Sequence, residues 1–294
     1  MKKILIIFSF FISFFSCDKT NENEIKETNK IMYSNLAGEK SQKIVKDTLI
    51  KNGIKPENVN SFLEQVKLFN EAVDNKGLID EFKSIDNLNK IEYDLVYMIN
   101  KLDEKYPNFA GCNCRITTYT LMNDIIEINR DNIKGKSDYL FADFETIENL
   151  PLKLEFDIEN FKSFYSDIET VLTKDYSIHL NKILREWENR EIKFKNKNVS
   201  IISIFFHNEL DEPNTLFIGH IGILANYYNK YMFIEKLSPQ EPYQAIIFNN
   251  KVELNDYLMN KYDISYNQPT ASPLILENNN LLETYKLKEK EEGK

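Results

Sequence analysis

The residues best suited to chemistry are one cysteine and one histidine. Cys114 lies in GCNCRITTYTLM directly after Asn113, a favourable N-cap residue. If a helix begins there, the thiol sits in the first turn, where the helix dipole and the free N–H groups favour the thiolate. His220 lies in FIGHIGIL between Gly219 and Gly222, and glycine in a strand often marks close approach of a backbone or a ligand. The pair predicts a thiolate nucleophile served by an imidazole that transfers protons.

A third polar group usually orients the imidazole in such a site. Glu235 lies in YMFIEKL on the next expected strand. It shares a face of the sheet with His220 if the residue numbers that pair across the hairpin add to an odd number. The sequence leaves this register open. The fallback orienters are Asp211, Gln240 and Gln244. His207, at a strand end, is a weaker competitor for the base, and His179, on an amphipathic helix, is expected at the surface or boundary. The backbone N–H of Cys114 is the expected oxyanion donor.

Other roles for the thiol stay open. Cys114 could be a small hydrophobic residue of the core. Cys112 and Cys114 could form a disulfide in an oxidising compartment, although a bridge across one residue strains the usual geometry. With a histidine and a carboxylate they could also hold a metal ion, although zinc ligands usually stand two to four residues apart. Glycine-rich phosphate loops and the GxSxG and HExxH motifs are missing from the sequence, so we expect no cofactor and no metal.

The elements that must position these residues fall into two halves. Helical spacing of apolar residues predicts helices in SQKIVKDTLIKNG, PENVNSFLEQVKLFNEAVDNKG, IEYDLVYMINKLDEKYP and YSIHLNKILREWENREI. The stripe Cys114, Thr118, Leu121, Ile125 and Ile128 predicts that the cysteine helix continues to Ile128. NVSIISIFFHN, TLFIGHIGILANYYN, KYMFIEKLS and YQAIIF predict consecutive antiparallel strands, followed by a helix in VELNDYLMNKY and an extended SPLILEN. The predicted fold class is α+β, with a helical N-terminal half packed on an antiparallel sheet.

The N-terminus predicts export. MKKILIIFSFFISFFSC has a basic start, an apolar run too short to span a bilayer and a small residue before Cys17, so residues 1–16 are expected to be a signal peptide. Cys17 resembles the lipidated cysteine of bacterial lipoproteins, with Phe14 where Leu is common. Residues 17–30 are expected to form a lipidated polar tether, and residues 31–294 a single α+β domain.

The composition and net charge limit the kinds of partner that this protein can bind. Hydrophobic residues make up 42% of the chain and aromatic residues 13%, enough for a sizeable core. Removal of Lys2 and Lys3 with the signal takes the formal charge from −9 to −11. Because sequence-independent binding of nucleic acid needs a basic surface, we expect no nucleic-acid partner.

Two resemblances extend this interpretation. The order of a cysteine opening a helix, a histidine on a strand and a polar residue on the next strand resembles the papain-like superfamily, especially bacterial cell-wall amidases and endopeptidases, over about Cys114 to Glu235. Nearly the whole mature chain resembles the bacterial lipoprotein family known as domain of unknown function 4300, through YSNLA, NCRIT, FIGHIGIL, FIEKL, QEPYQ and NQPTASP. The second resemblance implies the domain boundaries and a lipid-anchored setting, but no activity.

The sequence thus predicts a lipoprotein of the cell envelope, anchored outside the cytoplasm on a periplasmic or surface face. Cys114 would attack an amide or acyl carbonyl, His220 would accept and then donate the proton, and Glu235 would hold the imidazole. Cell-wall peptides are the expected substrate class. The alternative is a non-catalytic binding or adhesion lipoprotein on the same scaffold.

Overall fold

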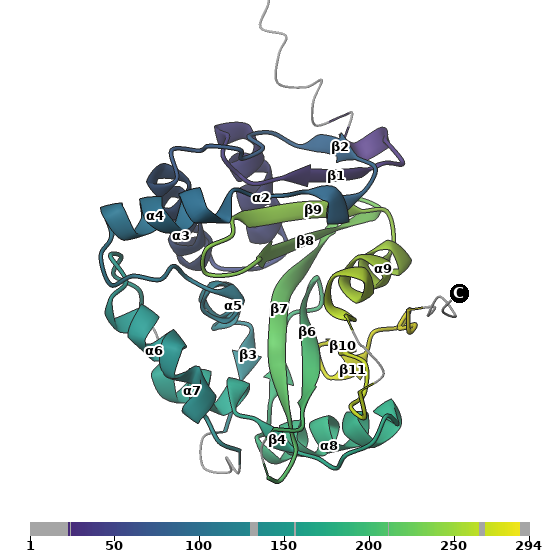
Figure 1. Ribbon diagram of the computed structural model, residues 1–294. Helices are drawn as coiled ribbons and strands as arrows, with labels where there is room; N and C mark the ends of the chain where they lie inside the picture. The colour runs from purple at the N-terminus through teal and green to yellow at the C-terminus, as the bar shows by residue number, and fades with distance from the viewer. Residues whose placement is uncertain are drawn as a thin grey trace, which may run out of the picture.

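The computed structural model describes residues 23, 25–129, 135–155, 157–210, 212–264 and 268–288. Nine strands of this part form one sheet in the order β11-β10-β6-β7-β8-β9-β1-β2, with β4 paired to β7, and the pairings are antiparallel. Helix α9 lies on the opposite side of the sheet from α2, α3 and α5 (Figure 1). The fold class is therefore α+β with an antiparallel sheet.

The bounds of the elements follow the chain. The helices are α2 (Glu39–Lys51), α3 (Pro56–Ala72), α4 (Leu95–Lys105), α5 (Cys114–Met122), α6 (Phe141–Glu148), α7 (Ile158–Tyr165), α8 (Tyr176–Asn189) and α9 (Lys251–Tyr262). The strands are β1 (Ile31–Ser34), β2 (Lys83–Ile85), β3 (Ile126–Glu127), β4 (Ile168–Glu169), β5 (Lys193–Phe194), β6 (Val199–Asn208), β7 (Thr215–Tyr227), β8 (Lys230–Lys236), β9 (Tyr243–Phe248), β10 (Leu274–Glu277) and β11 (Asn280–Leu281). Within the described residues, no helix is long and apolar enough to cross a bilayer.

The long central strands carry the core. Strands β6 to β9 are neighbours in the sheet and consecutive in the chain, as their β-branched and aromatic composition predicts. One large apolar cluster joins the sheet to α2, α3, α5, α7 and α8. A second cluster packs Leu254 and Leu258 of α9 against Leu224 and Phe233. Because side chains two positions apart in a strand share a face, His220 and Gly222 lie on the same side as Leu224, the side of α9.

The packed part of the chain begins before β1. Ile25 is fully buried, and the Lys230 ammonium group donates hydrogen bonds to the carbonyls of Ile25 and Thr28. The packed part of the chain therefore includes Ile25. The predicted signal peptide and Cys17 lie outside the described residues.

Helix α5 is shorter than predicted. It ends at Met122, and Ile126 belongs to β3, which pairs with β5. The Asn58 amide donates to the side-chain oxygens of Asn123 and Asp124 and holds the turn that follows the helix. The prediction was wrong because β-branched residues beyond the turn pair as a strand, which tertiary contacts favour over helical spacing.

The expectation that His179 lies at the surface or boundary was also wrong. Its side chain is fully buried in α8, with Nδ1 2.7 Å from the Thr170 hydroxyl and Nε2 2.9 Å from the Thr173 carbonyl oxygen. Both ring nitrogens are thus satisfied, which removes most of the cost of burying an imidazole.

Candidate functional site

The thiol of Cys114 is positioned by the start of α5. The Asn113 side chain accepts a hydrogen bond from the Ile116 N–H at 3.0 Å, so this N-cap starts the helix at Cys114 as predicted. The pairing between β7 and β8 ends where Gly222 faces Glu235, and β7 continues beyond it. The backbone N–H of Ile221, on this continuing part of β7, lies close enough to the Cys114 sulfur to favour the thiolate. The first turn of α5 therefore lies against the edge of β7 that β8 leaves uncovered.

His220 and Glu235 share a face of the sheet. Gly222 lies opposite Glu235, so the paired positions have an odd sum, and His220 stands two residues from Gly222. His220 Nε2 lies 2.5 Å from Glu235 Oε2. Both side chains are buried, with 2% and 0% of their surface exposed.

Two further groups hold the Glu235 carboxylate. The Gln244 amide and the Tyr257 hydroxyl donate to Glu235 Oε1 at 2.6 and 2.5 Å, and the Gln244 amide also lies 2.8 Å from the Tyr257 oxygen. Each carboxylate oxygen therefore has a donor, which a buried charge requires. Gln244, a fallback orienter of the imidazole, instead holds Glu235.

Of the other two fallback orienters, Gln240 makes its contact elsewhere. The Gln240 amide donates to the Ala110 carbonyl oxygen at 3.4 Å. Asp211 lies outside the described residues.

The thiol of Cys114 and the imidazole of His220 lie close enough to shift each other's pKa. Burial alone would raise the pKa of Cys114, but the charge and hydrogen bond of His220 lower it below its ordinary value. Burial alone would lower the pKa of His220, but Cys114 and then Glu235 raise it to about 9. Since Nε2 contacts Glu235, Nδ1 is the ring nitrogen left for the sulfur, and an imidazolium can donate from both nitrogens. The arrangement favours a thiolate beside an imidazolium beside a carboxylate.

A family model described as domain of unknown function (DUF4300) matches residues 32–282. The chain belongs to this family. The match spans Cys114, His220 and Glu235, together with Gln244 and Tyr257 that support them. The comparison with curated proteins finds no match, and neither does the comparison with solved structures.

The glycines that flank the histidine of this DUF4300 domain make room for rings. A Cβ atom at Gly219 would stand 2.2 Å from the Phe206 ring, and one at Gly222 would stand 2.6 Å from the Phe233 ring. The close approach that these glycines predict is therefore made by the protein's own aromatic side chains.

Next to the thiol, Arg115 and Asp143 form an ion pair that the sequence did not predict. Arg115 Nη2 lies 2.7 Å from Asp143 Oδ2, and the Asn113 amide donates to Asp143 Oδ1 at 2.7 Å. The fully buried Asp143 thus holds both the cap residue of α5 and the arginine that follows Cys114. It belongs to α6, and its sequence surroundings carry no signal for this contact.

The remaining two histidines lie together elsewhere. The rings of His179 and His207 have centroids 4.6 Å apart, and His207 Nδ1 accepts a hydrogen bond from the Ala271 N–H at 3.2 Å. The structure therefore groups His220, rather than His207, with the thiol.

Cys112 has a different setting from Cys114. Both cysteines are free thiols, so the disulfide alternative is not formed. Burial raises the pKa of Cys112 to about 12. Among the described residues, no three His, Cys, Asp or Glu side chains gather closely enough to hold a metal ion.

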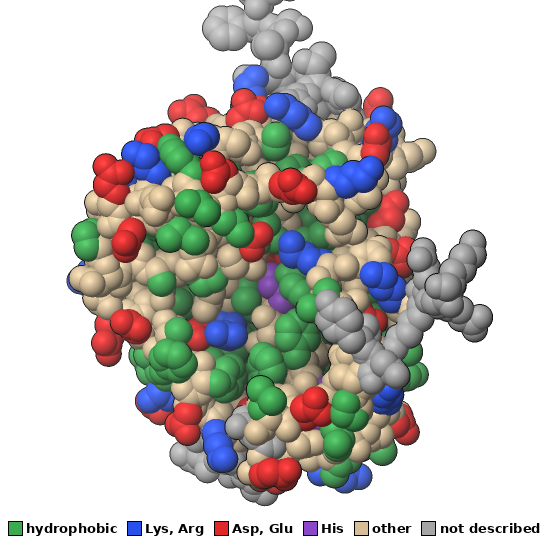
Figure 2. All heavy atoms as spheres, in the orientation of Figure 1, with side chains coloured by type: hydrophobic (Ala, Val, Ile, Leu, Met, Phe, Trp, Pro, Cys, Tyr) green, Lys and Arg blue, Asp and Glu red, His purple; other side chains and the backbone are tan. Residues whose placement is uncertain are grey.

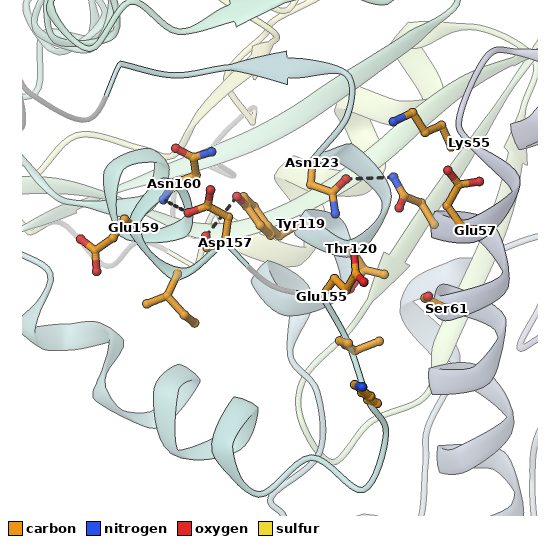
Figure 3. A pocket seen from close by; sticks show the side chains of 14 residues that line it. Lys55, Glu57, Ser61, Tyr119, Thr120, Asn123, Glu155, Asp157, Glu159 and Asn160 are labelled. Atoms are coloured by element: carbon orange, nitrogen blue, oxygen red, sulfur yellow. Dashed lines mark hydrogen bonds between the residues drawn. The ribbon is translucent and has the colours of Figure 1, made fainter.

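A separate cavity of about 1290 Å³ lies near the C-terminal end of α5 (Figure 3). Tyr119 and Thr120 line it from α5 and Asn123 from the C-cap of that helix, opposite residues of α3 and α7. The Tyr119 hydroxyl donates to the Asp157 carbonyl. Its lining does not include the thiol–imidazole pair. Figure 2 shows another hollow near the centre of one face, where a histidine side chain is visible among apolar and basic ones.

Proposed function

We propose that this DUF4300 domain is a thiol hydrolase that cleaves or transfers amide or acyl groups. The observation that carries the proposal is the line of side chains from Cys114 through His220 to Glu235, in which His220 bonds to Glu235 and lowers the pKa of Cys114. The line supplies a nucleophile, a proton carrier and an orienting carboxylate, which are the three roles that acyl transfer by a thiol needs.

The chemistry follows from these contacts. The thiolate attacks the carbonyl carbon, a C–S bond forms, and the carbonyl electron pair moves to oxygen beside the N–H of Cys114, which has no acceptor within the helix at this first-turn position. The His220 imidazolium then gives its proton to the leaving nitrogen, and the C–N bond breaks. Water hydrolyses the thioester with neutral His220 as the base. Because His220 has a pKa of about 9, amide cleavage should fall as the pH rises through that value.

The substrate and the setting belong to the same proposal. The order of cysteine, histidine and carboxylate in the chain, and the position of the thiol at a helix start, support a papain-like arrangement. The sequence of residues 1–17 supports export and lipid attachment at Cys17. Cell-wall peptides are accessible outside the cytoplasm, so they are the first substrate class to test.

The test uses synthetic cell-wall stem peptides and measures new amino groups by mass spectrometry. We expect wild type and Cys112→Ser to cleave the peptide, and Cys114→Ala to lose cleavage. Cys112→Ser is the matched control because it removes a neighbouring buried thiol from the same segment. Full activity of Cys114→Ala would refute the mechanism.

Low exposure favours a second candidate, a binding protein without catalysis. Cys114 is only 7% exposed and His220 only 2%, so a substrate carbonyl has little room to reach them. Titration of thiol reactivity against pH separates the two candidates. Reactivity of Cys114 that persists well below pH 7 supports the hydrolase, and a thiol with an ordinary or raised pKa supports the binding protein.

A further inference from the structure

The end of α9 places an unused hydroxyl group beside the thiol–imidazole pair. The Tyr262 ring stacks on the His220 ring, with centroids 4.7 Å apart and an angle of 25° between the planes. Phe206, which Gly219 admits, contacts the same tyrosine with centroids 6.1 Å apart. The Tyr262 ring is thus held between a catalytic ring and an apolar one.

Among the residues that the structure describes, the Tyr262 hydroxyl lacks the partner that burial normally demands. Its oxygen is buried and has no hydrogen-bond partner among the described residues. The nearby Tyr257 hydroxyl, also on α9, donates to Glu235. Leaving a buried hydroxyl unpaired is costly, whereas a phenylalanine would keep the ring stacking without that cost.

The protonation state of Tyr262 fits a donor. Burial, and then the charges of Glu235 and Cys114, raise the pKa of Tyr262 well above its ordinary value. The hydroxyl therefore keeps its proton throughout the neutral range. The influence of both charges also means that the hydroxyl lies within electrostatic range of the carboxylate and the sulfur.

We propose that the Tyr262 hydroxyl is a catalytic hydrogen-bond donor to the oxyanion that forms when Cys114 attacks a carbonyl. It would act with the N–H of Cys114, giving the two donors from which oxyanion sites are commonly built. The inference rests on the proposed function, since the oxyanion exists only if the thiol attacks a carbonyl.

Two small reagents separate this role from a structural one. With p-nitrophenyl acetate the sulfur attacks the carbonyl carbon, an oxyanion forms, and its collapse breaks the bond to p-nitrophenolate and leaves an acetyl thioester. With iodoacetamide the sulfur displaces iodide, and no oxyanion forms. A donor to the oxyanion should therefore affect the first reaction and leave the second unchanged.

The variant is Tyr262→Phe, and the control is Tyr97→Phe. The Tyr97 hydroxyl donates to Asp74, which is not part of the candidate site. We expect Tyr262→Phe to slow acetylation of Cys114 by roughly 10²-fold, the usual effect of one lost oxyanion donor. Its iodoacetamide rate should match wild type and its thermal midpoint should be no lower, because the substitution removes an unpaired buried hydroxyl. Tyr97→Phe should keep both rates.

The outcomes distinguish the two proposals. Equal acetylation rates in wild type and Tyr262→Phe, with alkylation intact, would overturn the role of Tyr262 and leave the hydrolase standing. Parallel losses of both rates would mean that Tyr262 only holds His220 in place, which also overturns it. A wild-type Cys114 that reacts with neither reagent would overturn the hydrolase and this inference together.

Discussion

Two cysteines separated by one residue have opposite chemistry in this domain. Cys112 and Cys114 are both buried free thiols, with 3% and 7% of their surface exposed. Burial raises the pKa of Cys112 to about 12, whereas the pKa of Cys114 is lowered. Burial is nearly the same at the two positions, so their partners make the difference.

The partners follow from where each residue stands relative to α5. Cys114 is in the first turn and contacts His220 and the N–H of Ile221. Cys112 precedes the helix and contacts Tyr243, with Lys236 close enough for its charge to favour the thiolate. The Lys236 ammonium group also donates to the carbonyls of Pro239 and Glu241 and lies 3.7 Å from the centre of the Phe69 ring. Burial lowers the pKa of Lys236 to about 7, so this side chain carries its charge only part of the time at neutral pH and does not offset burial at Cys112.

The largest expected effect is on the relative reactivity of the two thiols. At pH 7 a thiol of pKa about 12 is ionised in only about one molecule in 10⁵, so iodoacetamide should label Cys114 at least roughly 10³-fold faster than Cys112. Peptide mapping by mass spectrometry measures each site separately. Cys112→Ser should leave the rate at position 114 unchanged. Similar labelling of both cysteines would show that the contact with His220 does not activate Cys114.

Replacing His220 should make the two cysteines more alike. In His220→Asn the amide can still donate to Glu235, but the charge that lowers the pKa of Cys114 is lost, and burial then raises it. Peptide cleavage should fall by roughly 10²–10⁴-fold, the range that general acid–base catalysis contributes. His207→Asn, in the other histidine pair, should keep the wild-type rate. If both variants behave alike, His220 has no special role.

Much of the fold can be predicted from local sequence patterns, and the contacts across the sheet cannot. Helix α3 with Pro56 in its first turn and the strands β6 to β9 follow from spacing and composition alone. Strand β1 was not predicted, because it pairs with β9, more than 200 residues along the chain. Such long-range pairing has no local signature.

The candidate site divides in the same way. The N-cap before Cys114 and the glycines around His220 are visible in the sequence. The hairpin register that brings Glu235 to His220 is not, because a shift of one residue would turn the carboxylate to the other face. Tyr257 and Tyr262 could not be found either, since they reach the site from α9 only when that helix folds across the sheet.

A smaller effect is expected from Glu235→Gln. The amide keeps the shape of the carboxylate but removes the negative charge that helps to raise the pKa of His220. Peptide cleavage should fall by about 10–100-fold, the loss that is typical when the carboxylate partner of a metal-bound histidine is changed. Its decline at alkaline pH should begin below pH 9, because neutral imidazole then appears earlier. An unchanged pH profile would show that Glu235 does not act on His220.

Glu235→Ala tests the same carboxylate through its effect on the free energy of unfolding. It leaves His220, Gln244 and Tyr257 without their shared acceptor, and breaking a buried charged cluster costs about 3–5 kcal/mol in the free energy of unfolding. Urea denaturation measures the loss. Glu235→Gln should lose less, because it fills the same space and keeps an oxygen that can accept.

The smallest effect on the thiol is expected from His179, the histidine with neutral partners. Its ring lies between the Thr170 hydroxyl and the Thr173 carbonyl, so it stabilises the fold through hydrogen bonds to these two groups. His179→Leu leaves those groups unpaired and should lower the free energy of unfolding by about 1–3 kcal/mol. The iodoacetamide rate of Cys114 at pH 6 should stay at the wild-type value, because no contact links this ring to the Cys114–His220 pair among the described residues. A slower Cys114, measured at a temperature where His179→Leu is fully folded, would mean that two histidines, not one, control the thiol. In that case the contact with His220 alone would not explain why Cys114, buried like Cys112, has the lowered pKa.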